Sequence, residues 1–171
     1  MIKPWMHGVI YQATFFITVM LGNIWALAWS ALLLFTVVFK QPKPVLAFIA
    51  LVTVGGYCVD LLIQAAGLIQ FTGNTLLGPI WLFVLWIGFA NVIWHLAWRI
   101  PMLWLQILLG AVSGPLSYFG GAKLGAAEPM DTAGIIAYSL WWAFAFPAGI
   151  ALRHAWQKRF LDDPSSAPTS D

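Results

Sequence analysis

The sequence predicts an all-α protein, a polytopic membrane helix bundle of about six transmembrane helices with both termini in the cytoplasm. Of its 171 residues, 61% are hydrophobic and only 8% are charged, whereas soluble domains carry about 25% charged residues. Hydrophobic runs of about 20 residues, long enough to cross a bilayer, recur along the whole chain. These runs are continuous rather than alternating at period two, which favours helices over an outer-membrane barrel.

The six helices follow from the places where turn residues interrupt these runs. Residues 8–39 are apolar almost without a break, and a single helix of that length would measure about 48 Å, well beyond a hydrocarbon core of about 30 Å. We therefore divide this run at Gly22-Asn23 into helices over residues 5–21 and 24–39. Further helices are expected over residues 44–66, 79–97, 102–121 and 132–156, with a kink at Pro147. Residues 1–160 form one domain, and the tail 161–171 is expected to be disordered.

The basic residues support this topology. With six helices, seven of the eight Lys and Arg residues fall on one side of the membrane and only Lys123 falls on the other. Because cytoplasmic loops are enriched in Lys and Arg, we place both termini in the cytoplasm of a bacterial inner membrane. Keeping residues 8–39 as one span would put Lys40 and Lys43 opposite Lys3, so five helices are disfavoured. Basic residues in short loops between apolar runs indicate topology and not nucleic-acid binding.

Asp60 is the strongest candidate for a functional residue. It is the only carboxylate before Glu128, and it lies inside an apolar segment. A charged, unpaired acid near the middle of a bilayer costs a few kcal/mol, so such a residue normally faces the protein interior, water or a partner. At 1.5 Å per residue, Asp60 lies about 22 Å from the cytoplasmic edge, level with Ser117 and Tyr118.

Other polar and aromatic groups reach a similar depth. Trp81 and Tyr138 enter from the opposite edge of the membrane, and Gln64 lies one turn from Asp60 on the same helix. Lys123 is the nearest basic residue that could neutralise Asp60. Two readings stay open: a structural ion pair or a protonated acid, and a site for a polar headgroup or a proton-coupled step.

Small residues accompany these groups at helical spacing. One stripe comprises Thr53, Gly56, Asp60, Gln64 and Gly67, and a second comprises Gln106, Gly110, Ser113 or Gly114, Ser117 and Gly121. Such rows allow close helix packing in lipid, so packing alone could explain both stripes. Packing does not explain why the acidic residue Asp60 lies in the first stripe.

A second cluster is expected in the cytoplasmic half, where Asn91 and His95 lie one turn apart and Arg99 follows. His95 could act as an acid or base near neutral pH, although a hydrogen-bonded structural role is more common. The sequence predicts no metal site, because His95 has no second His or carboxylate at ligand spacing and Cys58 is the only cysteine. No Walker loop, dinucleotide fingerprint or nucleophile elbow is present, and no cofactor is expected.

Several motifs together resemble a known family. They are Gly55-x4-Asp60-x6-Gly67, Pro79-Ile80-Trp81-Leu82, and Gly114-Pro115-Leu116-Ser117-Tyr118 followed by Gly121-Ala122-Lys123-Leu124-Gly125-Ala126. The chain is similar in these segments to the bacterial inner-membrane family called domain of unknown function 2878. The resemblance implies a small polytopic protein of proteobacteria without an established activity, often encoded near enzymes that modify membrane fatty acids.

We therefore expect a polar pocket in the periplasmic half that binds a lipid or other amphipathic molecule and serves envelope lipid metabolism. Its expected ligand-binding residues are Asp60, Gln64, Trp81, Ser117, Tyr118 and Lys123, with Asn91, His95 and Arg99 as secondary candidates. Membrane lipids are the expected partners, whether the protein is an enzyme or an accessory. The alternative is a small-solute transport subunit similar in size to the substrate-binding subunits of energy-coupling-factor vitamin importers, although the first helix lacks a clear Ala-x-x-x-Ala docking row. A third reading is a purely structural membrane subunit.

Overall fold

The described part of the chain is a bundle of long helices. The computed structural model describes residues 3–34, 38–72 and 78–162. Its elements are α1 (Pro4–Leu33), α2 (Lys43–Ala65), α3 (Ile80–His95), the short 3-10 helix η2 (Ala97–Arg99), α4 (Leu103–Lys123) and α5 (Thr132–Phe160). Counting α3 and η2 together, five helices are long and apolar enough to cross a membrane. The predicted all-α polytopic bundle is confirmed, whereas the disorder expected for the tail falls on residues 163–171, outside the described residues.

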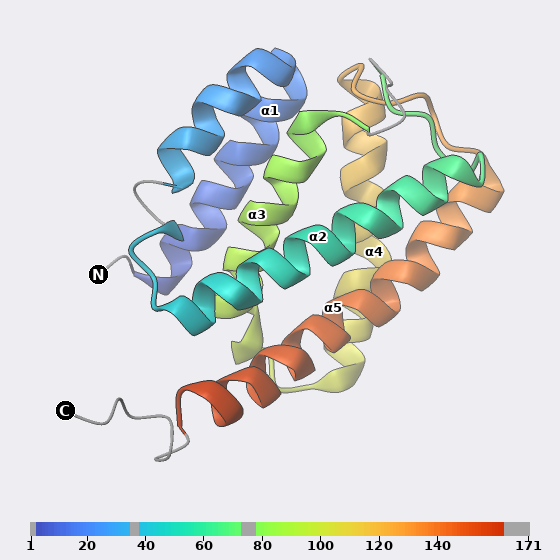
Figure 1. Cartoon of the computed structure of the whole chain (residues 1–171). Helices are drawn as coiled ribbons and strands as arrows, with labels where there is room; N and C mark the ends of the chain where they lie inside the picture. The colour runs from blue at the N-terminus through green and yellow to red at the C-terminus, as the bar shows by residue number, and fades with distance from the viewer. Residues whose placement is uncertain (1–2, 35–37, 73–77, 163–171) are drawn as a thin grey trace.

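The first element, α1, reverses direction at Gly22. Gly22 has φ 76° and ψ −167°, a conformation that only glycine adopts readily. The Trp29 indole N–H donates a 2.8 Å hydrogen bond to the Thr14 hydroxyl, although residues 15 apart in a straight helix would be separated by about 22 Å. The two arms of α1 therefore lie antiparallel, as Figure 1 shows.

The predicted division at Gly22-Asn23 is thus confirmed, but a sixth full span is not shown. The second arm, as far as Leu33, is about 16 Å long, which is shorter than a hydrocarbon core of about 30 Å. Other helix ends agree with the sequence analysis to within a few residues. Pro147 lies within α5, which runs on to Phe160.

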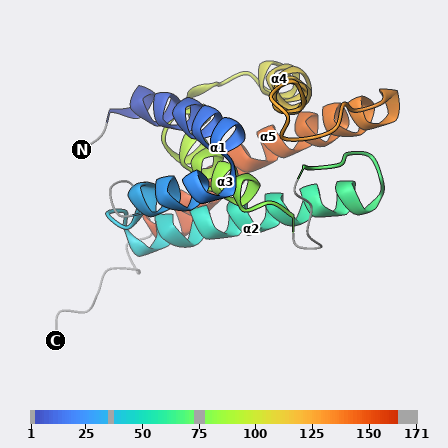
Figure 2. The ribbon, with the colours of Figure 1, turned by 90° about the horizontal axis from the view of Figure 1, so that it is seen from above.

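The central helix of the bundle is α3. It packs against both α1 and α2, while α4 packs mainly against α5, an arrangement visible from two directions in Figures 1 and 2. Two thirds of its apolar stretch is buried, whereas less than a third of the apolar stretch of each of the other four helices is buried. The exposed side chains include Ile24, Leu62, Leu140 and Phe144. Large hydrophobic side chains on several faces fit a protein surrounded by lipid.

Two indole rings and two glycines hold the bundle together at mid-height. The rings of Trp86 in α3 and Trp142 in α5 are stacked, 5.3 Å apart and within 5° of parallel. A Cβ atom at Gly56 in α2 would overlap the Trp86 ring, and one at Gly114 in α4 would overlap the Trp142 ring. At these two glycines, the predicted small-residue stripes pack closely against aromatic rings.

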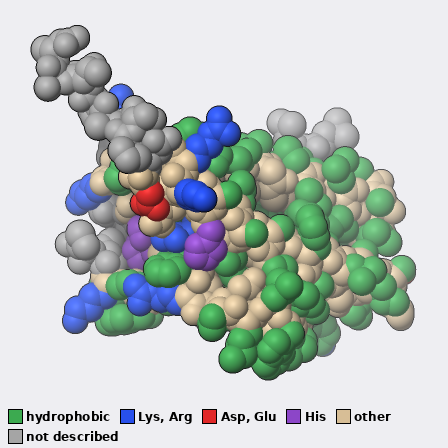
Figure 3. All heavy atoms as spheres, turned by 90° about the horizontal axis from the view of Figure 1, so that it is seen from below, with side chains coloured by type: hydrophobic (Ala, Val, Ile, Leu, Met, Phe, Trp, Pro, Cys, Tyr) green, Lys and Arg blue, Asp and Glu red, His purple; other side chains and the backbone are tan. Residues whose placement is uncertain are grey.

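The two ends of the bundle differ in character. At one end, the loops that follow α2 and α4 pair through backbone hydrogen bonds, from Thr72 N–H to the Ala126 carbonyl at 2.9 Å and from Glu128 N–H to the Gln70 carbonyl at 2.8 Å. At the other end lie the start of α1, the start of α2, η2 and the end of α5 (Figure 1). Figure 3 shows Lys and Arg side chains gathered at this second end.

Candidate functional site

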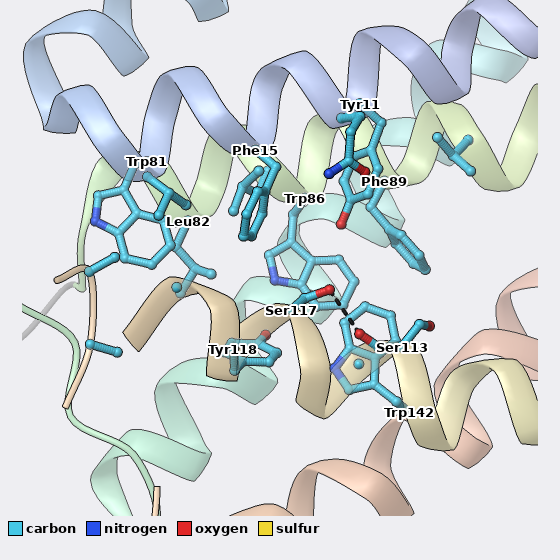
Figure 4. A pocket seen from close by; sticks show the side chains of 18 of the residues that line it. Tyr11, Phe15, Trp81, Leu82, Trp86, Phe89, Ser113, Ser117, Tyr118 and Trp142 are labelled. Atoms are coloured by element: carbon cyan, nitrogen blue, oxygen red, sulfur yellow. Dashed lines mark hydrogen bonds between the residues drawn. The ribbon is translucent and has the colours of Figure 1, made fainter. Parts of the chain in front are cut away.

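A cavity of about 280 Å³ lies between α1, α3 and α4, and the paired loops border one end of it. Nine of its twenty lining residues are aromatic: Tyr11, Phe15, Phe71, Trp81, Trp86, Phe89, Tyr118, Trp142 and Phe146. In Figure 4, side chains from α1 and from α4 face each other across this space, with Trp86 between them. The lining residues in the described part of the chain include no Lys, Arg, His, Asp or Glu.

Asp60 lies directly behind the cavity wall. Its side chain is fully buried and accepts a 2.7 Å hydrogen bond at Oδ2 from the Trp86 indole N–H. The Tyr118 hydroxyl lies 2.7 Å from both Oδ1 and Oδ2. Hydrogen bonds to a carboxylate are stronger than those between neutral groups, so Asp60 links α2 to α3 and α4. Both donors line the cavity, whereas Asp60 itself does not.

The prediction that Lys123 neutralises Asp60 is wrong. Lys123 is exposed, and its ammonium nitrogen lies 5.5 Å from the centre of the Phe119 ring. Lys123 follows Tyr118 by five residues, which is a rotation of about 140° around a helix with 3.6 residues per turn. A helix that directs Tyr118 inward therefore directs Lys123 away. Among the hydrogen-bonding and ionic partners of Asp60 in the described residues there is no cation.

Tyr138 completes the cluster from α5. Its ring is fully buried and packs on the Tyr118 ring, with 4.0 Å between the ring centres. Its hydroxyl lies beside Asp60 and Tyr118 but makes no well-aligned hydrogen bond within the described residues. The sequence analysis placed Tyr138 at this depth without assigning it to the site.

The sequence analysis missed Trp86 as a donor to Asp60. The available signal was Gly56, one turn before Asp60. A glycine on the side of a helix that faces the bundle interior indicates that a large group approaches closely. That signal does not identify the group. With eleven Trp residues in the chain, only the packing of α2 on α3 selects Trp86.

Two more predicted site residues line the same cavity. Trp81, in α3, meets the Phe71 ring edge-on, with 5.6 Å between the ring centres. The Ser117 hydroxyl, in α4, donates to the Ser113 carbonyl at 2.8 Å. Gln64 is half-buried in α2 and does not line the cavity. The structure thus brings Trp81, Ser117 and Tyr118 to the cavity wall, with Asp60 directly behind it, and leaves Gln64 and Lys123 outside the cavity.

The secondary candidates Asn91, His95 and Arg99 each contact a different residue. Asn91 is buried and donates through Nδ2 to the Ile87 carbonyl at 2.9 Å. The His95 ring stacks on His7 of α1, with 3.9 Å between the ring centres, a contact that the sequence analysis missed. Arg99 is exposed and lies over the Trp98 ring. Within the described ranges, no three His, Cys, Asp or Glu side chains are grouped as metal ligands would be.

One comparison with known proteins gave a match. A family model described as a protein of unknown function, DUF2878, matches residues 4–148. This range includes the whole cavity wall together with Asp60 and Tyr138. The comparisons with curated proteins and with solved structures found no match for the chain.

Proposed function

The chain belongs to the DUF2878 family, and we propose that it binds an amphipathic molecule, such as a lipid, in the cavity between α1 and α4. The observation that carries this proposal is the cavity itself: about 280 Å³, lined mainly by aromatic and aliphatic side chains, with Tyr118 and Trp86 on its wall. Concave apolar sites with a few well-placed polar groups are typical of small-molecule binding. The buried hydrogen-bonded acid behind that wall gives the site a fixed polar end.

The ligand enters from the side, between two helices. Gln12 in α1 and Ser113 in α4 line the cavity and are also exposed, so the cavity reaches the surface between these helices. Close to this opening, Phe16 of α1 and Leu116 of α4 are both about half-exposed. In a bilayer these side chains contact acyl chains, which makes the opening accessible to a molecule dissolved in the membrane.

The volume limits what enters. Small-molecule pockets usually measure about 300–1,000 Å³, and this cavity of about 280 Å³ lies just below that range. It accommodates a headgroup with a short piece of chain, and it is too small for both acyl chains of a phospholipid. The remainder of an amphipathic ligand stays in the bilayer, between α1 and α4.

The same proposal includes a membrane topology. Reversal of α1 at Gly22 returns the chain to its starting side, so Lys40 and Lys43 lie at the same end as Lys3. Six crossings then put both termini in the cytoplasm of a bacterial inner membrane, as the distribution of Lys and Arg favours. Asp60 and the cavity then belong to the periplasmic half, where a role in envelope lipid metabolism, as enzyme or accessory, is the function we propose.

Filling the cavity tests the proposal. Gly121 is buried, lines the cavity, and would place a Cβ where no atom lies within 4 Å. We expect a leucine there to extend into this space and occupy the cavity. Gly55 is the matched control, because it is helical and exposed, and its Cβ would also meet nothing.

Native mass spectrometry and lipid analysis should be performed on protein purified in mild detergent. We expect an amphiphile to co-purify with the wild type and with Gly55→Leu, and its occupancy to fall at least fivefold in Gly121→Leu. Equal occupancy in all three proteins would contradict the proposal. A water-soluble ligand lost in Gly121→Leu would instead favour a transport subunit.

A further inference from the structure

We propose that the cavity selects an organic cation, an amine or quaternary ammonium group, as the polar end of its ligand. This inference rests on the proposed function, because it names the chemical class of the molecule that occupies the same cavity. Two observations carry it: a buried acid bonded only to neutral donors, and a cavity wall made largely of aromatic rings.

The first observation is the unbalanced charge of Asp60. Its carboxylate is fully buried and is held by one indole N–H and one phenol hydroxyl. Neutral donors stabilise a carboxylate, but they do not neutralise it, and a buried charge without a counter-charge is costly. Since Lys123 is directed away from it, a positive charge supplied by the ligand would complete the site.

The second observation is the aromatic wall. Trp86, Phe89, Tyr118 and Trp142 all line the cavity, and the face of an aromatic ring attracts a cation within about 6 Å. An anionic headgroup has no Lys or Arg to bind among the described lining residues, and it would lie near Asp60. A neutral headgroup would leave the charge of Asp60 unbalanced. The wall therefore favours a cation over both alternatives.

The two donors relay the charge of Asp60 to the cavity. Tyr118 and Trp86 direct their polar hydrogens at Asp60 while their side chains form part of the cavity wall. Because the Tyr118 proton is used in that bond, its oxygen can only accept a further hydrogen bond, which suits an ammonium N–H. Polarisation by the carboxylate makes both groups more electron-rich and strengthens their attraction for a cation.

Three probes of equal chain length test the inference: octyltrimethylammonium, octanol and octyl sulfate. Binding to the full-length protein in nanodiscs is followed by intrinsic fluorescence, because Trp81, Trp86 and Trp142 line the cavity. Empty nanodiscs correct for partition into lipid. Because aromatic faces attract a desolvated cation, we expect the cation to bind at least about tenfold more tightly than octanol, and octyl sulfate to bind most weakly.

The variant Asp60→Asn removes the charge and keeps the shape. We expect it to reduce the preference for the cation over octanol to less than about threefold, whereas the control Gly55→Leu, at an exposed position outside the cavity, keeps the wild-type preference. A preference that survives in Asp60→Asn would overturn the inference. Equal binding of the cation and octanol to the wild type would also overturn it, even if the variant fails to fold.

The failure of this inference is distinguishable from failure of the proposed function. Gly121→Leu should reduce binding of both the cation and octanol at least fivefold, because it fills the cavity whatever the headgroup. If Gly121→Leu lost octanol binding but the wild type showed no preference for the cation, the inference of a cationic ligand would be overturned. The proposed amphiphile site would remain supported. If Gly121→Leu altered the binding of neither probe, both the inference of a cationic ligand and the proposed function would be overturned.

Discussion

At the scale of single residues, the hydrogen bonding of the Asp60 side chain depends on the small size of Gly56. Gly56 lies one turn earlier in α2 and leaves room for the Trp86 ring, whose indole N–H bonds Asp60. In Gly56→Ala the new methyl group overlaps that ring, so the indole must shift and its 2.7 Å hydrogen bond weakens. We expect a loss of about 1–3 kcal/mol in stability, the usual cost of overpacking, measured as a lower unfolding temperature in detergent.

The neighbouring glycine provides the control. Gly55 precedes Gly56 in the same helix, is exposed, and its Cβ would meet no atom within 4 Å. Gly55→Ala should leave the unfolding temperature unchanged or raise it, because alanine is the better helix former by about 0.5–1 kcal/mol. Equal unfolding temperatures for the two variants would show that the Trp86 ring is not held against Gly56.

The sequence predicted the depth of the site residues in the membrane, because depth follows from distance along a helix. Rise per residue is uniform, so the depth of Asp60 correctly brought Tyr118 and Tyr138 to its level. The prediction failed for Lys123 because rotation about the helix axis was not considered: Lys123 lies about 7.5 Å further along α4 than Tyr118 and faces outward. Identifying Trp86 needs the packing of α2 on α3, and no pattern within one helix contains that information.

At the scale of elements, the reversal of α1 depends on Gly22. Its φ of 76° with ψ near 180° is accessible essentially to glycine alone. In Gly22→Ala the turn becomes strained by about 1–3 kcal/mol, so we expect a lower unfolding temperature and a weaker contact between Trp29 and Thr14. Gly120→Ala is the control, because Gly120 is helical and its Cβ would make only an ordinary contact with Phe15, at 3.8 Å.

A distance measurement tests the reversal directly. Spin labels at Val9→Cys and Leu32→Cys, both exposed positions, should lie within about 20 Å of each other when the arms are antiparallel. A straight helix would separate them by about 35 Å. Both cysteines are introduced into a Cys58→Ser protein, which lacks the native thiol. A measured separation of about 35 Å would contradict the hairpin.

Element boundaries were predictable because local chemistry sets them. Prolines and basic residues mark the start of α2, and Asp131 caps α5 by accepting a hydrogen bond from the Gly134 N–H at 2.8 Å. The pairing of the two loops across Phe71 and Ala127 was not predictable. Both paired segments are only a few residues long and are joined by the two backbone hydrogen bonds described above, so nothing in either sequence identifies the other.

At the scale of the whole molecule, the proposed topology depends on the charge distribution and on the reversal of α1 together. Lys3 precedes α1 in the sequence and Lys40 follows it. The two residues therefore lie on the same side of the membrane only if α1 crosses the membrane and returns. If α1 crossed once, the rest of the chain would keep its alternation and the N-terminus alone would change sides. The relative position of Lys3 and Lys40 therefore decides between six crossings and five.

Thiol labelling makes that comparison. In a Cys58→Ser background, cysteines replace Lys3, Lys40 or Lys123, all of which are exposed, and intact spheroplasts are treated with a membrane-impermeant maleimide. We expect rapid labelling at position 123 alone, and labelling at positions 3 and 40 only after permeabilisation, because the excess of Lys and Arg keeps those loops in the cytoplasm. Labelling at position 3 but not at position 40 in intact spheroplasts would reduce the count to five. Asp60 would remain in the outer half, since the crossings after Lys40 are the same in both topologies.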